Sequence, residues 1–219
     1  MAEADRVLYG YYRSSAAWRV RIALALKGLA YRQLPVSLIK GEQRSGGYLA
    51  LNPQGLVPAL QDKGRVLTQS LAICEYLDEA YPGGAPLLPP DPADRARARA
   101  MAMLIAADVH PLNNLRVLQF LTAELGVGEE GKQAWYAHWL REGFAALERM
   151  LAEGAGRCCL GDEVTLADIC LVPQVYNARR FKVPLEDFPL LTRVSAWLES
   201  LPAFADTHPD RQPDAPPAD

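Results

Sequence analysis

The feature that most restricts the fold is a change of hydrophobic pattern at a segment rich in proline and glycine. Residues 82–90 read PGGAPLLPP, a composition that disfavours regular secondary structure. Before this segment strand and helix patterns alternate, whereas after it the apolar runs recur at helical spacing. A chain of 219 residues has room for two small domains. We therefore predict an α/β domain over residues 1–83, a linker over 84–90 and an all-helical domain over 91–219.

The order of elements in the first domain predicts a four-stranded mixed sheet with helices on its faces. Residues 6–12 and 31–38 have strand patterns and flank a helical run that ends at Gly28. After a short helix over residues 48–51, the pieces VPAL and RVL surround QDKG, an arrangement typical of a hairpin. The apolar run LAICEYLDEAY then predicts a helix that ends before Pro82.

The second domain carries several signals for helix ends. Asp91, which precedes a proline, is a favourable start for a helix, and residues 133–153 form a long amphipathic segment. Thr165 and Asp168, before an apolar run, resemble a capping box with aspartate in place of the commoner glutamate. From about residue 208 the tail is rich in proline and aspartate, so we expect it to be disordered.

Composition argues against two classes of partner. Half of the residues are apolar and 22% are charged, and the net charge is −3 with an isoelectric point near 5.7. Such a chain has no overall field that attracts nucleic acid or an anionic membrane. No window reaches the roughly 18 apolar residues of a spanning helix, and MAEADRVLYG lacks the apolar core of a secretion signal. We therefore expect neither nucleic acid nor a membrane as a partner.

The four cysteines and three histidines have no spacing typical of a redox or metal site. The cysteines include no CxxC pair, so we interpret them as free, mostly buried thiols in a reducing compartment. The histidines lie far apart in the chain and lack metal-ligand spacing. These observations predict a cytoplasmic protein without a metal site.

The segment RSSAAWRVR, over residues 13–21, is the first place where we expect chemistry. Ser14 and Ser15 lie where a strand leads into a helix, and a helix N-terminus presents free N–H groups and about half a positive charge. A hydroxyl there can donate a hydrogen bond to a bound thiolate or oxyanion. The simpler interpretation is that Ser14 or Ser15 only caps the helix.

Two further segments indicate a site for a small, extended, anionic ligand. Pro58 is a candidate for a cis peptide bond, which would turn the backbone N–H and carbonyl of Val57 outward toward a peptide-like ligand. The simpler interpretation is that Pro58 only starts a strand. Gln69 and Ser70 open the next helix, again a favourable place for a carboxylate.

Five segments together resemble the zeta class of glutathione transferases, the maleylacetoacetate and maleylpyruvate isomerases. They read SSAAWRVRIALALKG, LNPQGLVPAL, QSLAICEYL, GDEVTLADICLVPQV and NARRFKV, and the resemblance extends from about residue 6 to Pro213. It implies the glutathione transferase fold, which is an α/β thioredoxin-like N-terminal domain followed by an all-α C-terminal domain. It also implies a homodimer that uses glutathione as its cofactor.

The resemblance implies roles for individual residues. Ser14, with Ser15 as the second candidate, would donate a hydrogen bond to the thiolate of glutathione. Arg13 and Arg180 would bind the carboxylates of the substrate, because a guanidinium fork matches a carboxylate. The residues implied to contact glutathione are Ser14, Ser15, Ala16, Ala17, Trp18, Arg19, Gln43, Val57, Gln69, Ser70, His110, Asn114, Leu115 and Arg116.

One position departs from the family pattern. The family signature commonly reads Ser-Ser-Cys, and here the third position is Ala16. Disulfide exchange between this residue and glutathione is therefore impossible. A glutaredoxin-like thiol reductase is disfavoured for the same reason.

The resemblance implies the cis–trans isomerisation of maleylacetoacetate to fumarylacetoacetate in tyrosine and phenylalanine catabolism, or of maleylpyruvate to fumarylpyruvate. The thiolate of glutathione would add to the double bond of a small dicarboxylic cis-enone, the new single bond would rotate, and elimination would restore the alkene as trans. Two alternatives stay open: a glutathione transferase that acts on small α-haloacids, and a non-catalytic glutathione-fold interaction module.

Overall fold

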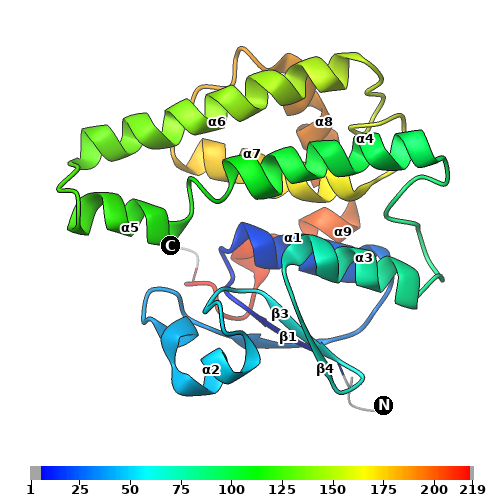
Figure 1. Ribbon diagram of the computed structural model, residues 1–219. Helices are drawn as coiled ribbons and strands as arrows, with labels where there is room; N and C mark the ends of the chain where they lie inside the picture. Colours follow the sequence, from blue (N-terminus) through cyan, green and yellow to red (C-terminus); the bar gives the residue numbers. More distant parts are fainter. Residues whose placement is uncertain (1–5, 218–219) are drawn as a thin grey trace. The chain divides into compact units, whose positions relative to one another are not determined.

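The computed structural model describes residues 6–217, which form two compact units. The first unit joins the residues up to Leu87 with those from Leu201 onward, and the second runs from Leu88 to Ser200. Figure 1 labels most of the helices and strands of both. The C-terminal segment thus belongs to the first unit, whereas the sequence pattern assigned it to the helical domain that begins at residue 91.

The first unit is built on a four-stranded mixed sheet. Its strands are β1 (Val7–Gly10), β2 (Arg32–Pro35), β3 (Ala59–Asp62) and β4 (Arg65–Thr68), in the order β2-β1-β3-β4. β1 runs parallel to β2 and antiparallel to β3, and β3 runs antiparallel to β4. This arrangement confirms the predicted mixed sheet and the hairpin, whose turn places Gly64 at a φ of 74°.

Two helices cover one face of this sheet. Helices α1 (Ser15–Leu26) and α3 (Ser70–Ala80) pack against each other there (Figure 1). Their inward side chains and those of the central strands form the core, whose largest fully buried aliphatic members are Leu8, Ile22, Leu24, Leu60, Ile73 and Leu77. The shorter elements of this unit are η1 (Glu42–Arg44), α2 (Gly46–Leu51), α9 (Pro202–Ala205) and η3 (Pro209–Arg211).

The tail is ordered where its composition indicated disorder. Asp214 accepts a hydrogen bond from the backbone N–H of Tyr12 at 2.8 Å and another from the Gln33 side chain at 3.0 Å. The expectation of disorder from about residue 208 is therefore wrong for the described part of the tail. A segment of this composition builds no core of its own, but it docks through polar groups onto a core that other residues have built.

The second unit is helical. Its elements are α4 (Pro92–Met103), the π-helical η2 (Leu104–Val109), α5 (Leu115–Ala123), α6 (Glu129–Ala152), α7 (Leu166–Arg180) and α8 (Pro189–Glu199). The side chain of Asp91 accepts hydrogen bonds from two N–H groups of the first turn of α4, as the Asp-Pro pair predicted. The amphipathic pattern also predicted the long helix α6, which begins four residues earlier than expected.

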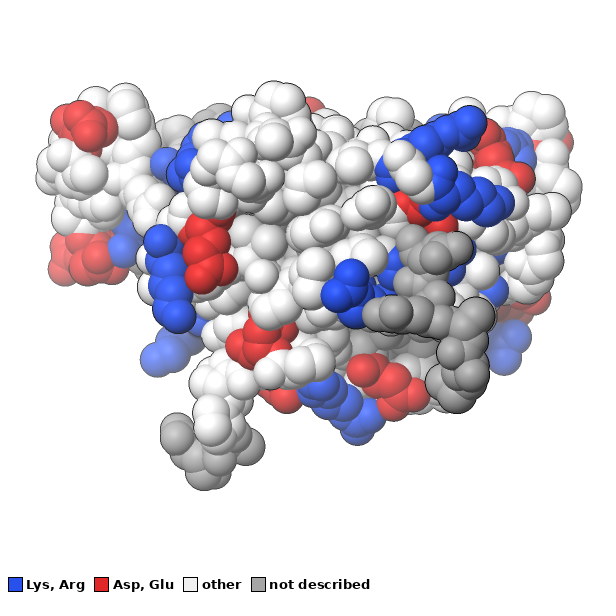
Figure 2. All heavy atoms as spheres, turned by 90° about the horizontal axis from the view of Figure 1, so that it is seen from below, with Lys and Arg blue, Asp and Glu red and all other residues white. Residues whose placement is uncertain are grey.

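Three further findings concern the surface charge, membrane-spanning helices and the cysteines. On the face seen in Figure 2, basic and acidic side chains lie interspersed, without an extended area of one sign. No helix within residues 6–217 has the length and apolarity to cross a bilayer. All four cysteines are free and buried, which confirms their interpretation as buried thiols.

The predicted capping box at the start of α7 is present and buried. The N–H and hydroxyl of Thr165 donate to Oδ2 of Asp168 at 2.7 and 2.9 Å, and the N–H of Cys159 donates to Oδ1 at 2.7 Å. Burial raises the pKa of the Asp168 carboxyl, and these donors oppose that shift. One buried carboxylate thus pairs the N–H of the N-cap residue Thr165 and the N–H of Cys159 in the preceding loop.

We predict that Asp168→Ala lowers the free energy of unfolding by about 3 kcal/mol, because it leaves buried N–H groups without acceptors. The matched control is Asp162→Ala. Asp162 also accepts a backbone hydrogen bond, from Arg157 at 2.8 Å, but it is exposed, so water can replace it and its loss should cost much less than that of Asp168. Denaturant unfolding measures both, and equal losses would contradict the role given to burial.

Candidate functional site

Three segments of the first unit meet at one edge of its sheet. In the ladder, Tyr9 lies opposite Ala59, and Ala59 lies opposite Thr68. β1 and β4 both run antiparallel to β3, so both end at the edge where β3 begins. The residues after β1, the residues before β3 and the residues after β4 are therefore neighbours in space. They include Ser14, Val57 and Gln69, which the sequence proposed as site residues.

Ser14 caps α1 and keeps a hydroxyl proton to donate. Its Oγ accepts a hydrogen bond from the N–H of Ala17 at 3.2 Å, and its own N–H donates to the carbonyl of Tyr11 at 3.0 Å. A hydroxyl that accepts one hydrogen bond can still donate another. The first turn of α1 carries no acidic side chain, so no carboxylate offsets the positive end of the helix. Capping a helix and donating to an anion are thus compatible roles for this residue.

The rest of the RSSAAWRVR segment lies mostly inside the unit. Ser15 is 4% exposed, Ala17 is fully buried and Ala16 is half-buried. The indole N–H of Trp18 donates to Oγ1 of Thr207 at 3.0 Å in the C-terminal segment. Arg13 is half-buried, with its guanidinium over the Tyr12 ring. Of this segment, therefore, Arg13, Ser14 and Ala16 retain exposed surface.

The peptide bond between Val57 and Pro58 is cis, as the sequence suggested. Just before it, the carbonyl of Leu56 accepts hydrogen bonds from the Tyr48 hydroxyl at 2.6 Å and from the Asn52 side chain at 2.7 Å. Among the described residues, the N–H and carbonyl of Val57 have no hydrogen-bond partner. The loop is therefore fixed immediately before a residue whose backbone can still pair with an extended ligand.

Gln69 has an unusual backbone at the start of α3. Its φ of 68° is in the region that favours glycine, although it carries a side chain. Non-glycine residues with such angles cost about 1 to 3 kcal/mol and are concentrated at functional sites. The side chain is exposed and donates to Oε1 of Gln54 at 2.8 Å.

Arg19 places a buried cation beside the start of α3. It is 1% exposed, and its Nη1 donates to Oγ of Ser70 at 3.3 Å. Its Nε and Nη2 are buried and have no hydrogen-bond partner among residues 6–217. A buried cation without an anionic partner next to a helix N-terminus favours the binding of a carboxylate there.

Gln43 lies beside the loop that leads to Val57. It belongs to η1, and a Cβ built at Gly55 would lie 3.0 Å from its carbonyl oxygen. Gly55 has a φ of 60°, so a side chain at this position would be strained as well as crowded. The Oε1 atom of Gln43 is buried and has no hydrogen-bond partner within the described part of the chain.

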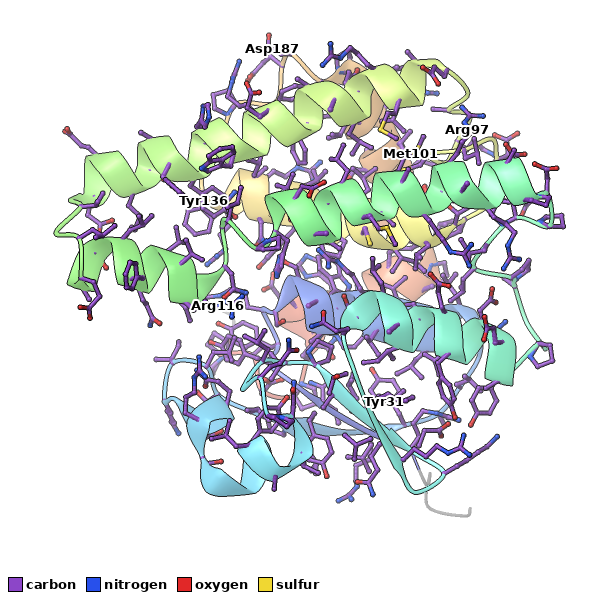
Figure 3. The ribbon with its side chains drawn as sticks, in the orientation of Figure 1. Tyr31, Arg97, Met101, Arg116, Tyr136 and Asp187 are labelled. Carbon is purple, nitrogen blue, oxygen red and sulfur yellow. The ribbon has the colours of Figure 1, made fainter. Side chains whose placement is uncertain are left out.

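The remaining predicted residues belong to the second unit. His110 follows η2, and Asn114 caps α5 by accepting a hydrogen bond from the N–H of Arg116 at 3.1 Å. Leu115 and Arg116, the first two residues of α5, are exposed (Arg116 is labelled in Figure 3). Arg180 ends α7, with its guanidinium 4.4 Å from the centre of the Phe181 ring.

Tyr136 is a buried residue that the sequence did not indicate as part of the site. It contacts both the residue after α7 and the segment before α5. Tyr136 stacks on Phe181 with a ring separation of 3.8 Å, and its carbonyl accepts a hydrogen bond from Asn113 at 3.2 Å. Figure 3 labels it on α6. Burial raises the pKa of its phenol, and the charge of Arg180 opposes the shift. The only signal in the sequence was the aromatic run WYAHW, which is equally typical of a core helix.

Two family models match the chain in the order of its domains. The model described as "Glutathione S-transferase, N-terminal domain" matches residues 8–86, and "Glutathione S-transferase, C-terminal domain" matches residues 133–200. The class of protein is therefore that of the glutathione S-transferases.

Individual relatives narrow this class. A probable maleylacetoacetate isomerase of Vibrio cholerae is 52% identical over 211 residues, which cover 95% of this chain and 98% of that protein. The holo structure of a bacterial maleylpyruvate isomerase, described as a zeta-class glutathione S-transferase, has a TM-score of 0.93 at 46% identity and covers 96% of this chain and all of that one. The chain belongs to the maleylacetoacetate isomerase family, within the zeta class of glutathione transferases.

A third relative has been solved with ligands in its own active site. The maleylacetoacetate isomerase of Anaeromyxobacter dehalogenans was solved with dicarboxyethyl glutathione and citrate in its active site. It is 45% identical to this chain, with a TM-score of 0.87, and the match covers 99% of this chain and all of that one.

We predict that Arg19→Met changes the free energy of unfolding by less than about 1 kcal/mol, because a buried guanidinium with two unpaired nitrogens adds little net stability. Arg21→Met is the matched control on the same helix. Arg21 donates to the carbonyls of Tyr12 at 2.9 Å and Thr207 at 3.2 Å, so its loss should cost about 3 kcal/mol. Denaturant unfolding compares the two, and an equal loss would show that Arg19 is structural.

Proposed function

We propose that this chain is a glutathione-dependent cis–trans isomerase that converts maleylacetoacetate to fumarylacetoacetate, or maleylpyruvate to fumarylpyruvate. The identity of 52% to a probable maleylacetoacetate isomerase over nearly the whole chain supports the reaction class. The observation that carries the proposal is the hydrogen bonding of Ser14. Its Oγ accepts the hydrogen bond that caps α1, so its hydroxyl proton can still be donated to a bound anion.

The groups of the first unit fit glutathione, an extended peptide with a thiol and two carboxylates. The unpaired backbone of Val57 suits its peptide portion, and the start of α3 beside Arg19 suits a carboxylate. Gln69 and the buried oxygen of Gln43 offer further polar contacts. When bound, glutathione supplies the thiolate that adds to the double bond and leaves again after rotation.

The chain's own residues have three tasks in this scheme. Ser14 donates a hydrogen bond to the sulfur, and the N-terminus of α1 adds its positive end, so that both favour the thiolate over the thiol. One unit of thiol pKa corresponds to about 1.4 kcal/mol, which one charge-assisted hydrogen bond can supply. Arg13, and Arg180 from the second unit, bind substrate carboxylates through their guanidinium groups. Ser15 is the second candidate donor, and Ala16 excludes a protein thiol from this part of the site.

We propose the remaining glutathione contacts from the family likeness. In the second unit they are His110, Asn114, Leu115 and Arg116. Ala17 and Trp18, which the likeness also implies, are buried and support the Ser14 turn from inside. We further propose that the protein is a cytoplasmic homodimer that serves tyrosine and phenylalanine catabolism. Gel filtration with light scattering tests the homodimer, and fractionation of the cells tests the compartment.

The decisive assay compares turnover of maleylacetoacetate, maleylpyruvate and dichloroacetate by the purified protein, with and without glutathione. We expect isomerisation to require glutathione and to exceed the turnover of the haloacid. A dominant rate on the haloacid would support the alternative transferase function instead. If calorimetry detected no binding of glutathione at millimolar concentration, a non-catalytic interaction module would be the better description.

We predict that Ser14→Ala lowers kcat about 100-fold, a loss typical of one donor to developing charge, while the Kd for glutathione changes less than about threefold. The same variant should raise the pKa of the bound thiol, which the pH dependence of kcat/KM reports. Loss of the cap should also cost about 1 kcal/mol of stability.

The matched variant Ser14→Asp separates the two roles of this residue. Aspartate keeps an acceptor for the N–H of Ala17, so the stability should stay near that of the wild type. It lacks the donor and adds a negative charge, so activity should fall at least as far as in Ser14→Ala. An unchanged kcat in Ser14→Asp would remove Ser14 from the mechanism.

A further inference from the structure

The turn that carries Arg13 and Ser14 is held by a side chain from the far end of the chain. The backbone N–H of Tyr12 donates to Oδ2 of Asp214 at 2.8 Å. The other oxygen of that carboxylate accepts a hydrogen bond from Gln33 at 3.0 Å, so Asp214 joins the turn to β2. Both carboxylate oxygens are thus used, and 202 positions of sequence separate Asp214 from Tyr12.

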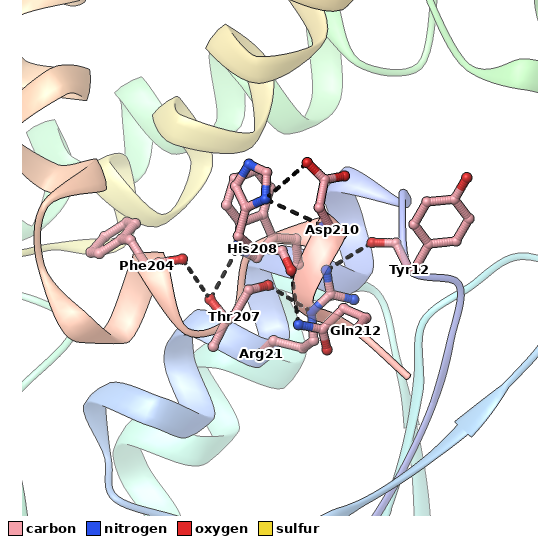
Figure 4. Close-up of polar contacts among 8 residues, drawn as sticks. Tyr12, Arg21, Phe204, Thr207, His208, Asp210 and Gln212 are labelled. Atoms are coloured by element: carbon pink, nitrogen blue, oxygen red, sulfur yellow. Dashed lines mark hydrogen bonds and ion pairs between the residues drawn. The ribbon is translucent and has the colours of Figure 1, made fainter. Parts of the chain in front are cut away.

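A buried arginine holds the carbonyl of the same residue (Figure 4). Arg21 is fully buried, and its Nη2 donates to the carbonyl of Tyr12 at 2.9 Å. Its Nε donates to the carbonyl of Thr207 at 3.2 Å. Burial lowers the pKa of Arg21 to about 10, with Tyr31 and Asp214 opposing the shift, so the guanidinium stays charged at neutral pH.

The tail is in turn anchored on α1. Oγ1 of Thr207 accepts the hydrogen bond from the Trp18 indole at 3.0 Å and donates to the carbonyl of Ala203 at 2.7 Å. The ring of His208 lies edge-on to Trp18 at 5.2 Å. The tail thus contacts α1, whose N-terminus forms part of the candidate site, as well as the turn before it.

These contacts leave the turn little freedom. Both backbone groups of Tyr12 are held by side chains, and the carbonyl of Tyr11 accepts the N–H of Ser14 at 3.0 Å. Catalytic groups must stay within about 0.5 Å of their productive position, and a displacement of about 1 Å can cost up to 100-fold in rate.

We propose that Asp214, Arg21 and Thr207 are positioning residues that hold the Tyr11–Ser14 turn, and with it the Ser14 hydroxyl and the Arg13 guanidinium, in the geometry that catalysis requires. This inference rests on the proposed function, because it gives the C-terminal tail a task in the same site. In this proposal the tail acts on Ser14 and Arg13 through the backbone of Tyr12, whose N–H donates to Asp214.

The test uses Asp214→Ala in the full chain, with the pKa of bound glutathione as the first readout. Titration of the thiolate absorbance should show a rise of about one pKa unit, and kcat should fall about tenfold while the Kd for glutathione changes less than about threefold. Asp214→Asn keeps an acceptor for the N–H of Tyr12 and should recover both values to within about threefold.

The control is Asp206→Ala, which removes another carboxylate of the tail. Asp206 pairs with Arg211 at 2.8 Å in an exposed contact that involves no residue of the Tyr11–Ser14 turn, so its loss should change neither readout. If Asp214→Ala does not fold, Gln33→Leu replaces it as the test. Gln33→Leu removes one of the two hydrogen bonds that the Asp214 carboxylate accepts, so it should change the thiol pKa and kcat in the same direction but by less.

Two results separate the failure of this proposal from that of the proposed function. A folded Asp214→Ala, or a folded Gln33→Leu, with the wild-type thiol pKa and kcat would overturn the positioning role. A wild-type protein that binds glutathione with a lowered thiol pKa but isomerises neither substrate would overturn the proposed function. In that case the thiol titration of the Asp214 variants would still decide whether the tail positions Ser14.

Discussion

The candidate site depends on the antiparallel pairing of β3 with both of its neighbours. β1 and β4 both run antiparallel to β3. Both strands therefore end at the end of the sheet where β3 begins. α1 and α3 therefore begin close together, and Arg19 on one reaches Ser70 on the other. The first turns of both helices lack acidic side chains, so two positive helix ends lie beside the unpaired backbone of Val57.

Two arginines on α1 are buried inside the first unit, and their guanidinium groups have different roles. Arg21 satisfies carbonyls of a turn and of a tail, neither of which has a strand partner to pair with. Arg19 makes one hydrogen bond and keeps two unpaired nitrogens beside the start of α3. Among the described residues Arg21 finds partners for two of its three nitrogens and Arg19 for one, so the first arginine is best explained by structure and the second by a ligand.

Sequence patterns predicted the elements whose causes are local. The hairpin around Gly64 and the capping box of Thr165 and Asp168 depend on residues a few positions apart, and both are present. The tail was misjudged because its order depends on partners such as Tyr12, 202 positions away. For Ser14 and Val57 the residues alone left a simpler structural interpretation open, and the register that makes them neighbours is a property of the whole sheet. Their roles came from the family resemblance, and they remain proposals.

Alanine at position 16 has a consequence for covalent modification of the protein. All four cysteines are buried, and burial raises the pKa of Cys158 to about 12 and that of Cys159 well above its usual value. An electrophile that enters the site meets no cysteine of the Ser-Ser-Cys signature, and the chain's own thiols are poor nucleophiles. An alkylating compound therefore finds no protein thiol at position 16 to modify.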